Sequence, residues 1–209
     1  SNLNVNHAKK FIEGCSNACR DVDCVLSGGE TAEMPDVYNS GHFDVVGTIV
    51  GIKVLEKTPI VKGDVIISIS SSGPHTNGYS LIRKCIDKED PPKEIMDIFL
   101  EPHRCYLHNI KYIEKLFPNI IKDMCHITGG GTRNISRILP PNLEIDTYDH
   151  DIPKWCKWIQ RVSGMSWDEM YETFNMGIGY LIILDKNTYP LFKSVKNINF
   201  EYKEYGVIK

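Results

Sequence analysis

The sequence predicts an α/β (α+β) fold in two parts: a partial N-terminal sheet domain, then a C-terminal domain with a mixed sheet flanked by helices. Helix-like and strand-like segments interleave along the 209 residues without a regular strand–helix repeat, which favours such layered architectures. The apolar, β-branched runs are short, as strands are. The polar segment 56–64 carries a proline and a glycine, so we expect domains at residues 1–58 and 59–209.

The first part is predicted to contain one helix and two strands. Apolar residues recur at helical spacing over residues 7–20, and Cys15 and Cys19 are expected on the buried face of that helix. A short strand is expected at 24–26, before a glycine pair. A longer strand is expected at 43–54, where valine and isoleucine are frequent.

The second part is predicted to begin with a buried strand over residues 65–70. Helices are expected at 79–90, 93–100, 106–117 and 188–196, and further strands at 142–148 and 180–184. Ser166 and Glu169 have the spacing of a capping box, which marks a helix start. The tryptophans at 155, 158 and 167 are expected to pack together in the core.

Composition excludes several classes of function. The net charge of −3 and the scattered lysines give no basic patch for nucleic acid or for a membrane surface. The longest apolar runs are far too short to span a bilayer, and no signal-peptide pattern is present at the N-terminus. We therefore expect a cytoplasmic protein with no nucleic-acid partner and no membrane partner.

The seven cysteines are expected to be free thiols. Their number is odd, and no CxxC pair is present. A structural zinc site needs more closely paired cysteines or histidines than this chain offers in sequence. Free thiols are typical of a reducing compartment, which agrees with the expected location.

The first candidate site motif is the segment 26–35, Leu-Ser-Gly-Gly-Glu-Thr-Ala-Glu-Met-Pro. Gly28 and Gly29 free the backbone, and the carboxylates of Glu30 and Glu33 follow before a proline. A packed core has no use for this string, whereas a site for a magnesium-nucleotide or a cationic substrate does. The alternative is a strand end, a glycine turn and two solvated glutamates.

The second motif is the segment 70–81, Ser-Ser-Ser-Gly-Pro-His-Thr-Asn-Gly-Tyr-Ser-Leu, between a predicted strand and a predicted helix. Ser72, Gly73 and Asn77 can present backbone N–H groups and small polar side chains to a phosphate. His75 adds a group that titrates near neutral pH. The alternative is a long connecting loop that only caps the helix.

The third motif, the segment 126–131, reads His-Ile-Thr-Gly-Gly-Gly. Three consecutive glycines cost backbone entropy and favour a close approach of the backbone to another group. His126 and Thr128 can hydrogen-bond the same ligand. The alternative is a flexible turn beside a core histidine.

The fourth motif, the segment 169–179, reads Glu-Met-Tyr-Glu-Thr-Phe-Asn-Met-Gly-Ile-Gly. It predicts a helix that ends at Asn175 and Gly177, because both residue types tolerate the left-handed backbone of such an end. An apolar strand follows. By itself this motif is structural.

These four strings resemble, in the same order, motifs of the aminoimidazole ribonucleotide synthetase family, the cyclo-ligases of purine biosynthesis. The family strings are Gly-Gly-Glu-Thr-Ala-Glu-Met-Pro, Ser-Ser-Gly-x-His-Ser-Asn-Gly-x-Ser-Leu, His-Ile-Thr-Gly-Gly-Gly and Glu-Met-x-x-Thr-Phe-Asn-x-Gly-x-Gly. Thr76 replaces a serine here, and the stretch between Gly131 and Asn134 is one residue shorter than in the family. His103 stands where the family tends to have threonine.

The resemblance implies ATP-dependent ring closure of formylglycinamidine ribonucleotide to aminoimidazole ribonucleotide. ATP and Mg²⁺ are the implied cofactors, a small-molecule ribonucleotide the substrate and a homodimer the assembly. The implied catalytic residues are His75, His126 and Glu30, with Glu30 also a metal ligand. The implied substrate-binding residues are Gly28, Gly29, Thr31, Glu33, Ser72, Gly73, Asn77, Thr128, Gly129, Gly130, Gly131 and Asn175. We expect segments 28–33, 72–78 and 126–131 to line one cleft.

Family members are longer at the N-terminus, where they carry an Asp-Gly-x-Gly-Thr-Lys motif associated with nucleotide and metal. This motif does not occur in the 209 residues. The resemblance therefore implies that the chain is a fragment, inactive alone as a cyclo-ligase. An open sheet edge in its first part would favour pairing with a second chain. The alternative is a non-catalytic binding or assembly module that retains the fold.

Overall fold

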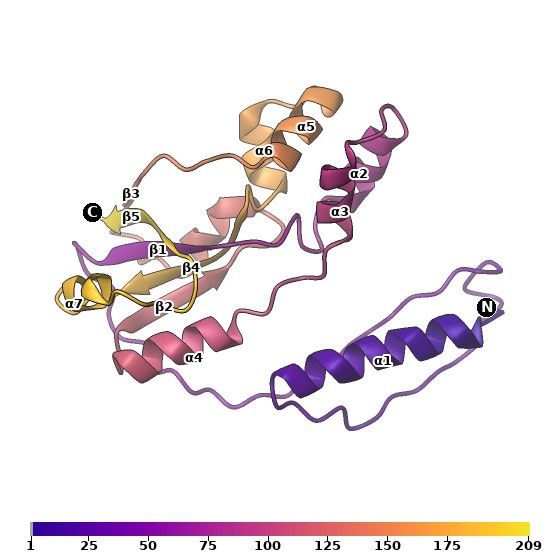
Figure 1. The fold of residues 1–209 in the computed structure, drawn as a ribbon, viewed down its shortest axis with the longest axis horizontal. Helices are drawn as coiled ribbons and strands as arrows, with labels where there is room; N and C mark the ends of the chain where they lie inside the picture. Colours follow the sequence, from indigo (N-terminus) through magenta and orange to yellow (C-terminus); the bar gives the residue numbers. More distant parts are fainter. Residues whose placement is uncertain (1) are drawn as a thin grey trace. The chain divides into compact units, whose positions relative to one another are not determined.

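The computed structural model describes residues 2–209 and divides the chain into two compact units, Ser1–Lys53 and Val54–Lys209 (Figure 1). The first unit contains the helix α1 (Val5–Asp21), which confirms the helix predicted at 7–20. Its N-terminus is capped by Asn4, whose side chain accepts a hydrogen bond from the backbone N–H of His7. Extended segments and turns make up the rest of this unit (Figure 1).

The two strands expected in the first unit are not formed. Residues 24–26 and 43–54 have no ladder partner within the described residues 2–53, and a strand exists only where another strand pairs with it. The side chains of Val46 and Val50 are accordingly 89% and 93% exposed. For the same reason α1 has no apolar layer of its own unit to cover, and Cys15 and Cys19 are only half-buried. The expectation of a buried cysteine face is wrong.

The second unit is built on a five-stranded sheet with the strand order β2-β4-β1-β5-β3 (Figure 1). The strands are β1 (Val65–Ser70), β2 (Ile121–His126), β3 (Ile145–Thr147), β4 (Ile178–Leu184) and β5 (Lys203–Ile208). Every neighbouring pair is antiparallel, so the expectation of a mixed sheet is wrong. β4 and β5 enter the sheet from the same end on either side of β1, with Leu184 and Val207 both opposite Val65.

Helices surround this sheet, and the predicted mixture of helices and strands is confirmed. They are α2 (Tyr79–Ile86), α3 (Lys93–Leu100), α4 (Leu107–Leu116), α5 (Lys154–Ser163), α6 (Trp167–Thr173), α7 (Tyr189–Ser194) and the 3₁₀ helix η1 (Gly131–Arg137). The predictions for 65–70, 93–100 and 180–184 are close to the observed bounds, and Ser166 forms the predicted capping box with Glu169. β2, β5, α5 and η1 were not predicted.

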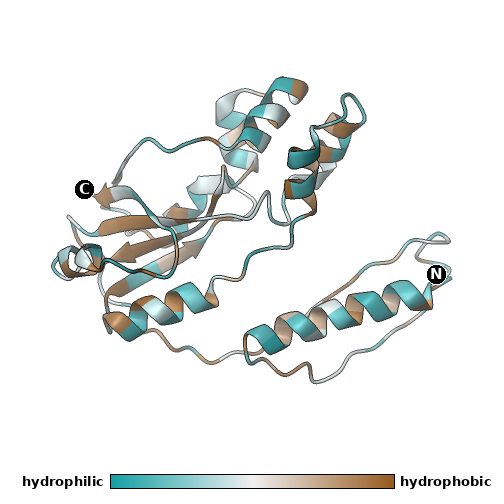
Figure 2. Cartoon of the chain, viewed as in Figure 1, coloured by the Kyte–Doolittle hydropathy of each residue, from teal (hydrophilic) through white to brown (hydrophobic). Residues whose placement is uncertain are grey.

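The core of the second unit has three apolar clusters. On one face of the sheet, α4 and α7 pack against Ile67 and Ile69 of β1, whereas Ile66 faces the opposite cluster, as the alternation of a strand requires. The third cluster lies among α2, α3, α5 and α6. Figure 2 shows apolar residues concentrated along the central strands. Trp155 and Trp158 are buried, but Trp167 at the first turn of α6 is 38% exposed, so the predicted three-tryptophan cluster is wrong.

All seven cysteines are free thiols, as predicted. None of the helices in residues 2–209 combines the length and the apolarity that a membrane crossing requires.

Candidate functional site

The second and third motifs meet at one end of the sheet. β1 and β2 both pair antiparallel with β4, so they run in the same direction and end at the same edge. Ser70, the last residue of β1, lies opposite Ile178, and His126, the last residue of β2, lies opposite Tyr180. The loops that follow these two strands therefore start side by side. This topology places His75 and His126 together.

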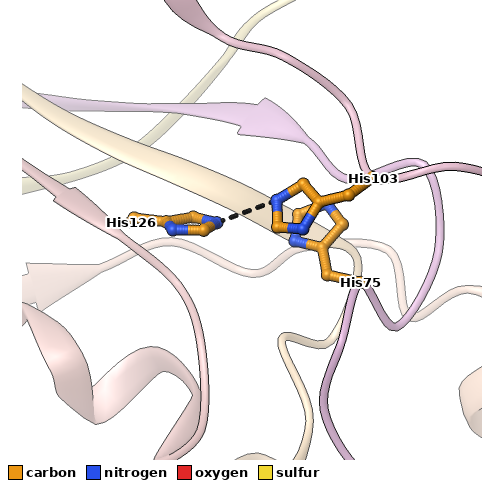
Figure 3. A group of neighbouring side chains, drawn as sticks. All are labelled: His75, His103 and His126. Atoms are coloured by element: carbon orange, nitrogen blue, oxygen red, sulfur yellow. Dashed lines mark hydrogen bonds between the residues drawn. The ribbon is translucent and has the colours of Figure 1, made fainter. Parts of the chain in front are cut away.

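Three histidines form a cluster at this edge (Figure 3). The Nε2 atoms of His103 and His126 are 3.1 Å apart, within hydrogen-bond distance. The ring of His75 stacks on that of His103, with centroids 3.8 Å apart and an angle of 11° between the planes. His75 and His126 have their ring centroids 5.8 Å apart. His103 comes from the connection between α3 and α4.

The environment keeps the three imidazoles neutral. Burial, and then the proximity of His103 and His126, lowers the pKa of His75 to about 3. Burial lowers the pKa of His126, with His103 adding to the effect, and burial also lowers the pKa of His103. Neutral imidazoles each carry one N–H donor and one lone pair, so the cluster can exchange protons and bind ligands through nitrogen.

Tyr106 of the α3–α4 connection anchors His75. Its hydroxyl lies 2.9 Å from Nε2 of His75 and 3.4 Å from the backbone oxygen of Ser70. Burial raises the pKa of Tyr106, so the phenol stays protonated. When it donates its proton to Ser70, it accepts the Nε2–H of His75, and Nδ1 of His75 then carries the lone pair. That Nδ1 atom is buried and has no hydrogen-bond partner among the described residues.

The backbone of His75 is also unusual, with a φ of +58°. Non-glycine residues seldom adopt this left-handed conformation, which is held only when surrounding contacts over-determine it and which concentrates at functional sites. His75 is 4% exposed. The fold therefore holds this one imidazole buried and on a strained backbone.

We expect Tyr106→Phe to lower the free energy of unfolding by about 1–3 kcal/mol, because it leaves buried polar groups at His75 and Ser70 without their partner. The measurement is urea unfolding followed by circular dichroism. Tyr112→Phe is the matched control, since its hydroxyl bonds an exposed backbone oxygen of Asn197. A loss for Tyr106→Phe no larger than that for Tyr112→Phe would contradict the assignment.

Asn175 holds the second motif in place from inside the protein. Its Nδ2 donates to the backbone oxygen of Gly73 at 2.8 Å, and its Oδ1 accepts from Ser71 Oγ and from the backbone N–H of Gly177. The residue is 1% exposed. The structure thus places Asn175 beneath the loop, where it positions Gly73.

Ser72 links the second motif to the segment that carries His103. Its hydroxyl donates to the backbone oxygen of Pro102 at 2.9 Å and accepts from the backbone N–H of Arg104. These bonds fix the connection on either side of His103. Asn77 lies nearby, and its Oδ1 is the atom closest to where a side chain on Gly129 would begin, at 3.3 Å.

The three glycines of the third motif differ in their surroundings. Gly129 and Gly130 are exposed, and Thr128 accepts a hydrogen bond from Nδ2 of Asn134. Gly131 is buried with a φ of +56°, and a Cβ there would lie 1.8 Å from the backbone oxygen of Tyr171. The close approach at Gly131 is therefore to α6. Only Gly129 and Gly130 leave their backbone accessible to a ligand.

The first motif belongs to the other unit. Gly28, Gly29, Glu30, Thr31 and Glu33 lie in its extended segments and are exposed. Glu30 Oε1 accepts from the backbone N–H of Thr31 at 3.0 Å, and Glu33 Oε1 accepts from that of Leu3 at 2.8 Å. The convergence of this motif with the histidine cluster stays a prediction.

Two residues at this end of the sheet, one of them a member of the cluster, were not assigned a role from the sequence. His103 differed from the family pattern, which is the signal that could have singled it out, but only the fold places it against His75. Asn134 of η1 is 1% exposed, and its Oδ1 has no hydrogen-bond partner among the described residues. It lies 3.3 Å from where a Cβ on Gly130 would be. The end of the sheet thus combines imidazoles, an amide and accessible glycine backbone.

Comparison with known proteins places both units in one family. Residues 61–194 match the model described as AIR synthase related protein, C-terminal domain, and residues 1–53 match that of the N-terminal domain. A protein of Chromobacterium violaceum named phosphoribosylformylglycinamidine cyclo-ligase is 40% identical over 197 residues, which are 87% of this chain and 56% of that protein. Proteins with the same name from Neisseria meningitidis and Xylella fastidiosa are 39% and 36% identical, over 87% and 98% of this chain. The chain thus spans 56%, 57% and 62% of the length of these three curated relatives.

Proposed function

Because the chain belongs to the AIR synthase related protein family, we propose that it forms the ribonucleotide-binding part of a phosphoribosylformylglycinamidine cyclo-ligase of purine biosynthesis. The observation that supports this most directly is the meeting of the His75 loop and the His126–Gly131 loop at one end of the sheet. Two family motifs that are far apart in sequence are adjacent there, as residues that bind one substrate must be.

The proposed reaction is the ATP-dependent closure of an imidazole ring. An amide oxygen is a poor leaving group, and a phosphoryl group supplied by ATP would convert the formyl oxygen into a good one before an internal nitrogen displaces it. The residues of this chain would bind and orient the ribonucleotide. The exposed backbone of Gly129 and Gly130 would approach its phosphate or amide oxygens. His126 would accept or return a proton, whereas His75, with its pKa lowered to about 3, would act as a neutral hydrogen-bonding group that orients the substrate.

The histidine cluster does not fit Mg²⁺. Mg²⁺ prefers carboxylate, phosphate and water oxygens in octahedral geometry, and the cluster offers only nitrogen. Within the described residues 2–209, no group of three carboxylates has the spacing of a cation site. Glu30 remains the proposed Mg²⁺ ligand of this chain, in a site completed by the nucleotide.

Homodimer formation through the first unit also remains part of the proposal.

We expect the isolated chain to show no ATP-dependent turnover, because the Asp-Gly-x-Gly-Thr-Lys motif that the family associates with nucleotide is absent from the 209 residues. The test joins this chain to the preceding N-terminal segment of the Chromobacterium violaceum relative. Formation of aminoimidazole ribonucleotide is then compared between this hybrid and the isolated chain. The expected result is turnover by the hybrid alone.

A matched variant assigns the activity to this site. His75→Asn removes the imidazole but keeps a residue type that tolerates the left-handed backbone, and it is expected to abolish turnover by the hybrid. Turnover by the isolated chain at the rate of the hybrid would overturn the proposal that this chain binds the ribonucleotide but needs the added N-terminal segment for ATP. A folded hybrid that neither turns over nor binds the ribonucleotide would favour the non-catalytic assembly module instead.

A further inference from the structure

We propose that His75, His103 and His126 form a binding site for a divalent transition-metal ion of the Zn²⁺, Co²⁺ and Ni²⁺ type. One ring nitrogen from each of the three lies within 4.8 Å of the others, and among the described residues 2–209 this is the group of histidine, cysteine and carboxylate side chains with such spacing. Imidazole nitrogen suits these ions, whereas Mg²⁺ and Ca²⁺ prefer oxygen. The inference does not rest on the ring-closing function.

One of the three nitrogen–nitrogen distances is close to that of a bound site, and the other two are within 4.8 Å. A zinc ion with Zn–N bonds of about 2.0–2.1 Å at tetrahedral angles holds its ligand nitrogens about 3.4 Å apart. The Nε2 atoms of His103 and His126 are 3.1 Å apart, so this pair needs almost no adjustment. His75 and His103 are stacked, and their ring planes must open for both lone pairs to point at one ion.

His103 is the ring that can make this movement. It is exposed, and it lies in the connection between α3 and α4 rather than in a helix or strand. His126 is the last residue of β2, and its ring stacks on that of Tyr180 at 12° between planes. His75 is buried. His75 and His126 are therefore held in place, and a rotation of the His103 ring off its stack with His75, with its Nε2 kept near that of His126, completes the set (Figure 3).

The surroundings of His75 match those of a metal ligand. A ligating histidine usually bonds a polar partner through its second nitrogen, which fixes the ring and its tautomer. Tyr106 is that partner for Nε2 of His75, at 2.9 Å. The other nitrogen, Nδ1, is buried without a partner among the described residues, and a metal ion would satisfy it. Three neutral imidazoles also need no deprotonation before they bind.

Three protein ligands leave a coordination position open. Structural zinc sites usually have four protein ligands, whereas sites with three keep a position for water or for another ligand. A divalent ion on three neutral imidazoles keeps its positive charge, so the open position favours an anionic oxygen. The site would thus take a phosphate or a carboxylate as its fourth ligand.

His103 is the ligand that departs from the family pattern. The resemblance described above has threonine at this position, so His103→Thr restores the common pattern and removes one ligand from an exposed loop. The fold should tolerate the change, and an unchanged unfolding temperature verifies this. Loss of even an outer-shell partner of a metal ligand typically weakens metal affinity about 10–100-fold. We therefore expect His103→Thr to weaken Zn²⁺ affinity by at least about 100-fold.

The experiment measures Zn²⁺ and Co²⁺ binding to the metal-free full chain. Zn²⁺ affinity is obtained by competition with a chromophoric chelator, and Co²⁺ binding by visible absorption. One strong site is expected, with the d–d bands of a nitrogen-ligated ion and no thiolate-to-cobalt charge-transfer band, although seven free cysteines are present. His7→Gln, an exposed histidine of α1, is the matched control and should leave affinity unchanged.

Either of two results would overturn the inference. The first is equal Zn²⁺ affinity in the original chain and in His103→Thr. The second is a thiolate-to-cobalt band of the same strength in both proteins, which would assign the metal to cysteine. Neither readout depends on ATP or ribonucleotide, so failure here is distinguishable from failure of the cyclo-ligase proposal.

Discussion

Lys122→Met is expected to lower the free energy of unfolding by about 3–5 kcal/mol at neutral pH, the cost of breaking a buried ion pair by removing one partner. Lys122 lies in β2, and its Nζ is 3.2 Å from Asp64 Oδ2 and 3.3 Å from Asp185 Oδ2. It also donates to the backbone oxygen of Pro59 at 3.0 Å. Asp64 is fully buried, so the variant leaves its charge without a counter-ion. Methionine keeps the apolar stem of lysine, so lost packing contributes little.

The deficit of Lys122→Met should shrink in acid. Burial alone would raise the pKa of Asp185, but hydrogen bonds from the backbone of Thr188 and from Lys122 outweigh it and hold the pKa below its ordinary value. A carboxylate with a lowered folded pKa contributes stability above its unfolded pKa of about 3.9, and this is lost as pH falls through the folded pKa. Once Asp185 is protonated, the ammonium of Lys122 loses that charged partner, so removing the ammonium costs less.

Urea unfolding at pH 7 and near pH 3 measures both effects. Lys57→Met is the control, because Lys57 pairs with Asp123 of the same strand at 2.7 Å but is 66% exposed. Exposed pairs contribute about 0–1 kcal/mol. A deficit for Lys122→Met that equals that of Lys57→Met would show that the buried network is not stabilising. A larger deficit that does not change with pH would contradict the assigned role of Asp185.

This network explains why β2 was not predicted from the sequence. The strand reads Ile-Lys-Asp-Met-Cys-His, with two charged residues in succession and no clear alternation. Its lysine is buried because two aspartates from distant segments neutralise it, which is information that no local window contains. In contrast, the apolar run of β4 carries its own signal. The two strands expected in the first unit are the opposite case, because they were predicted but do not form. Their composition is strand-like, but a segment without a pairing partner forms no strand.

The sequence identified much of the candidate site but not its arrangement. His75 and His126 could be singled out because glycines and small polar residues surround them, and only the pairing of β1 and β2 with β4 brings them together. The role of Asn175 beneath Gly73 depends on a hydrogen bond between residues distant in sequence. Helix α5 did carry a local signal, because its buried residues Trp155, Cys156 and Ile159 have helical spacing.

Gly131→Ala is expected to lower the free energy of unfolding by about 2–5 kcal/mol, as the sum of two effects. An L-residue in the left-handed region costs about 1–2 kcal/mol, and overpacking of a tight site costs about 1–3 kcal/mol more. The added Cβ would lie 1.8 Å from the backbone oxygen of Tyr171 and 2.8 Å from that of Phe174. Backbone atoms cannot rotate away as a side-chain end can, so η1 and α6 must separate.

The same separation would disturb the candidate site. Phe174 precedes Asn175, whose amide holds Gly73 and Ser71 below the His75 loop. Movement at the end of α6 therefore reaches the second motif through one hydrogen-bonded side chain. In the Gly131→Ala protein we expect the candidate site to become less ordered while the sheet stays formed. The rate of amide hydrogen exchange should therefore rise more at residues 71–78 than in β1 and β4.

Gly164→Ala separates the backbone cost from the steric one. Gly164 ends α5 with a φ of +75°, and a Cβ there would meet nothing within 4 Å. It should therefore lose only the conformational part, about 1–2 kcal/mol. Urea unfolding measures the free energy of unfolding of both variants, and the difference between the two values is the energetic cost of the clash at Gly131. If Gly131→Ala were as stable as Gly164→Ala, contact with α6 would not be the reason for a glycine at position 131. A contact between the backbone of Gly131 and a ligand would then be the favoured explanation.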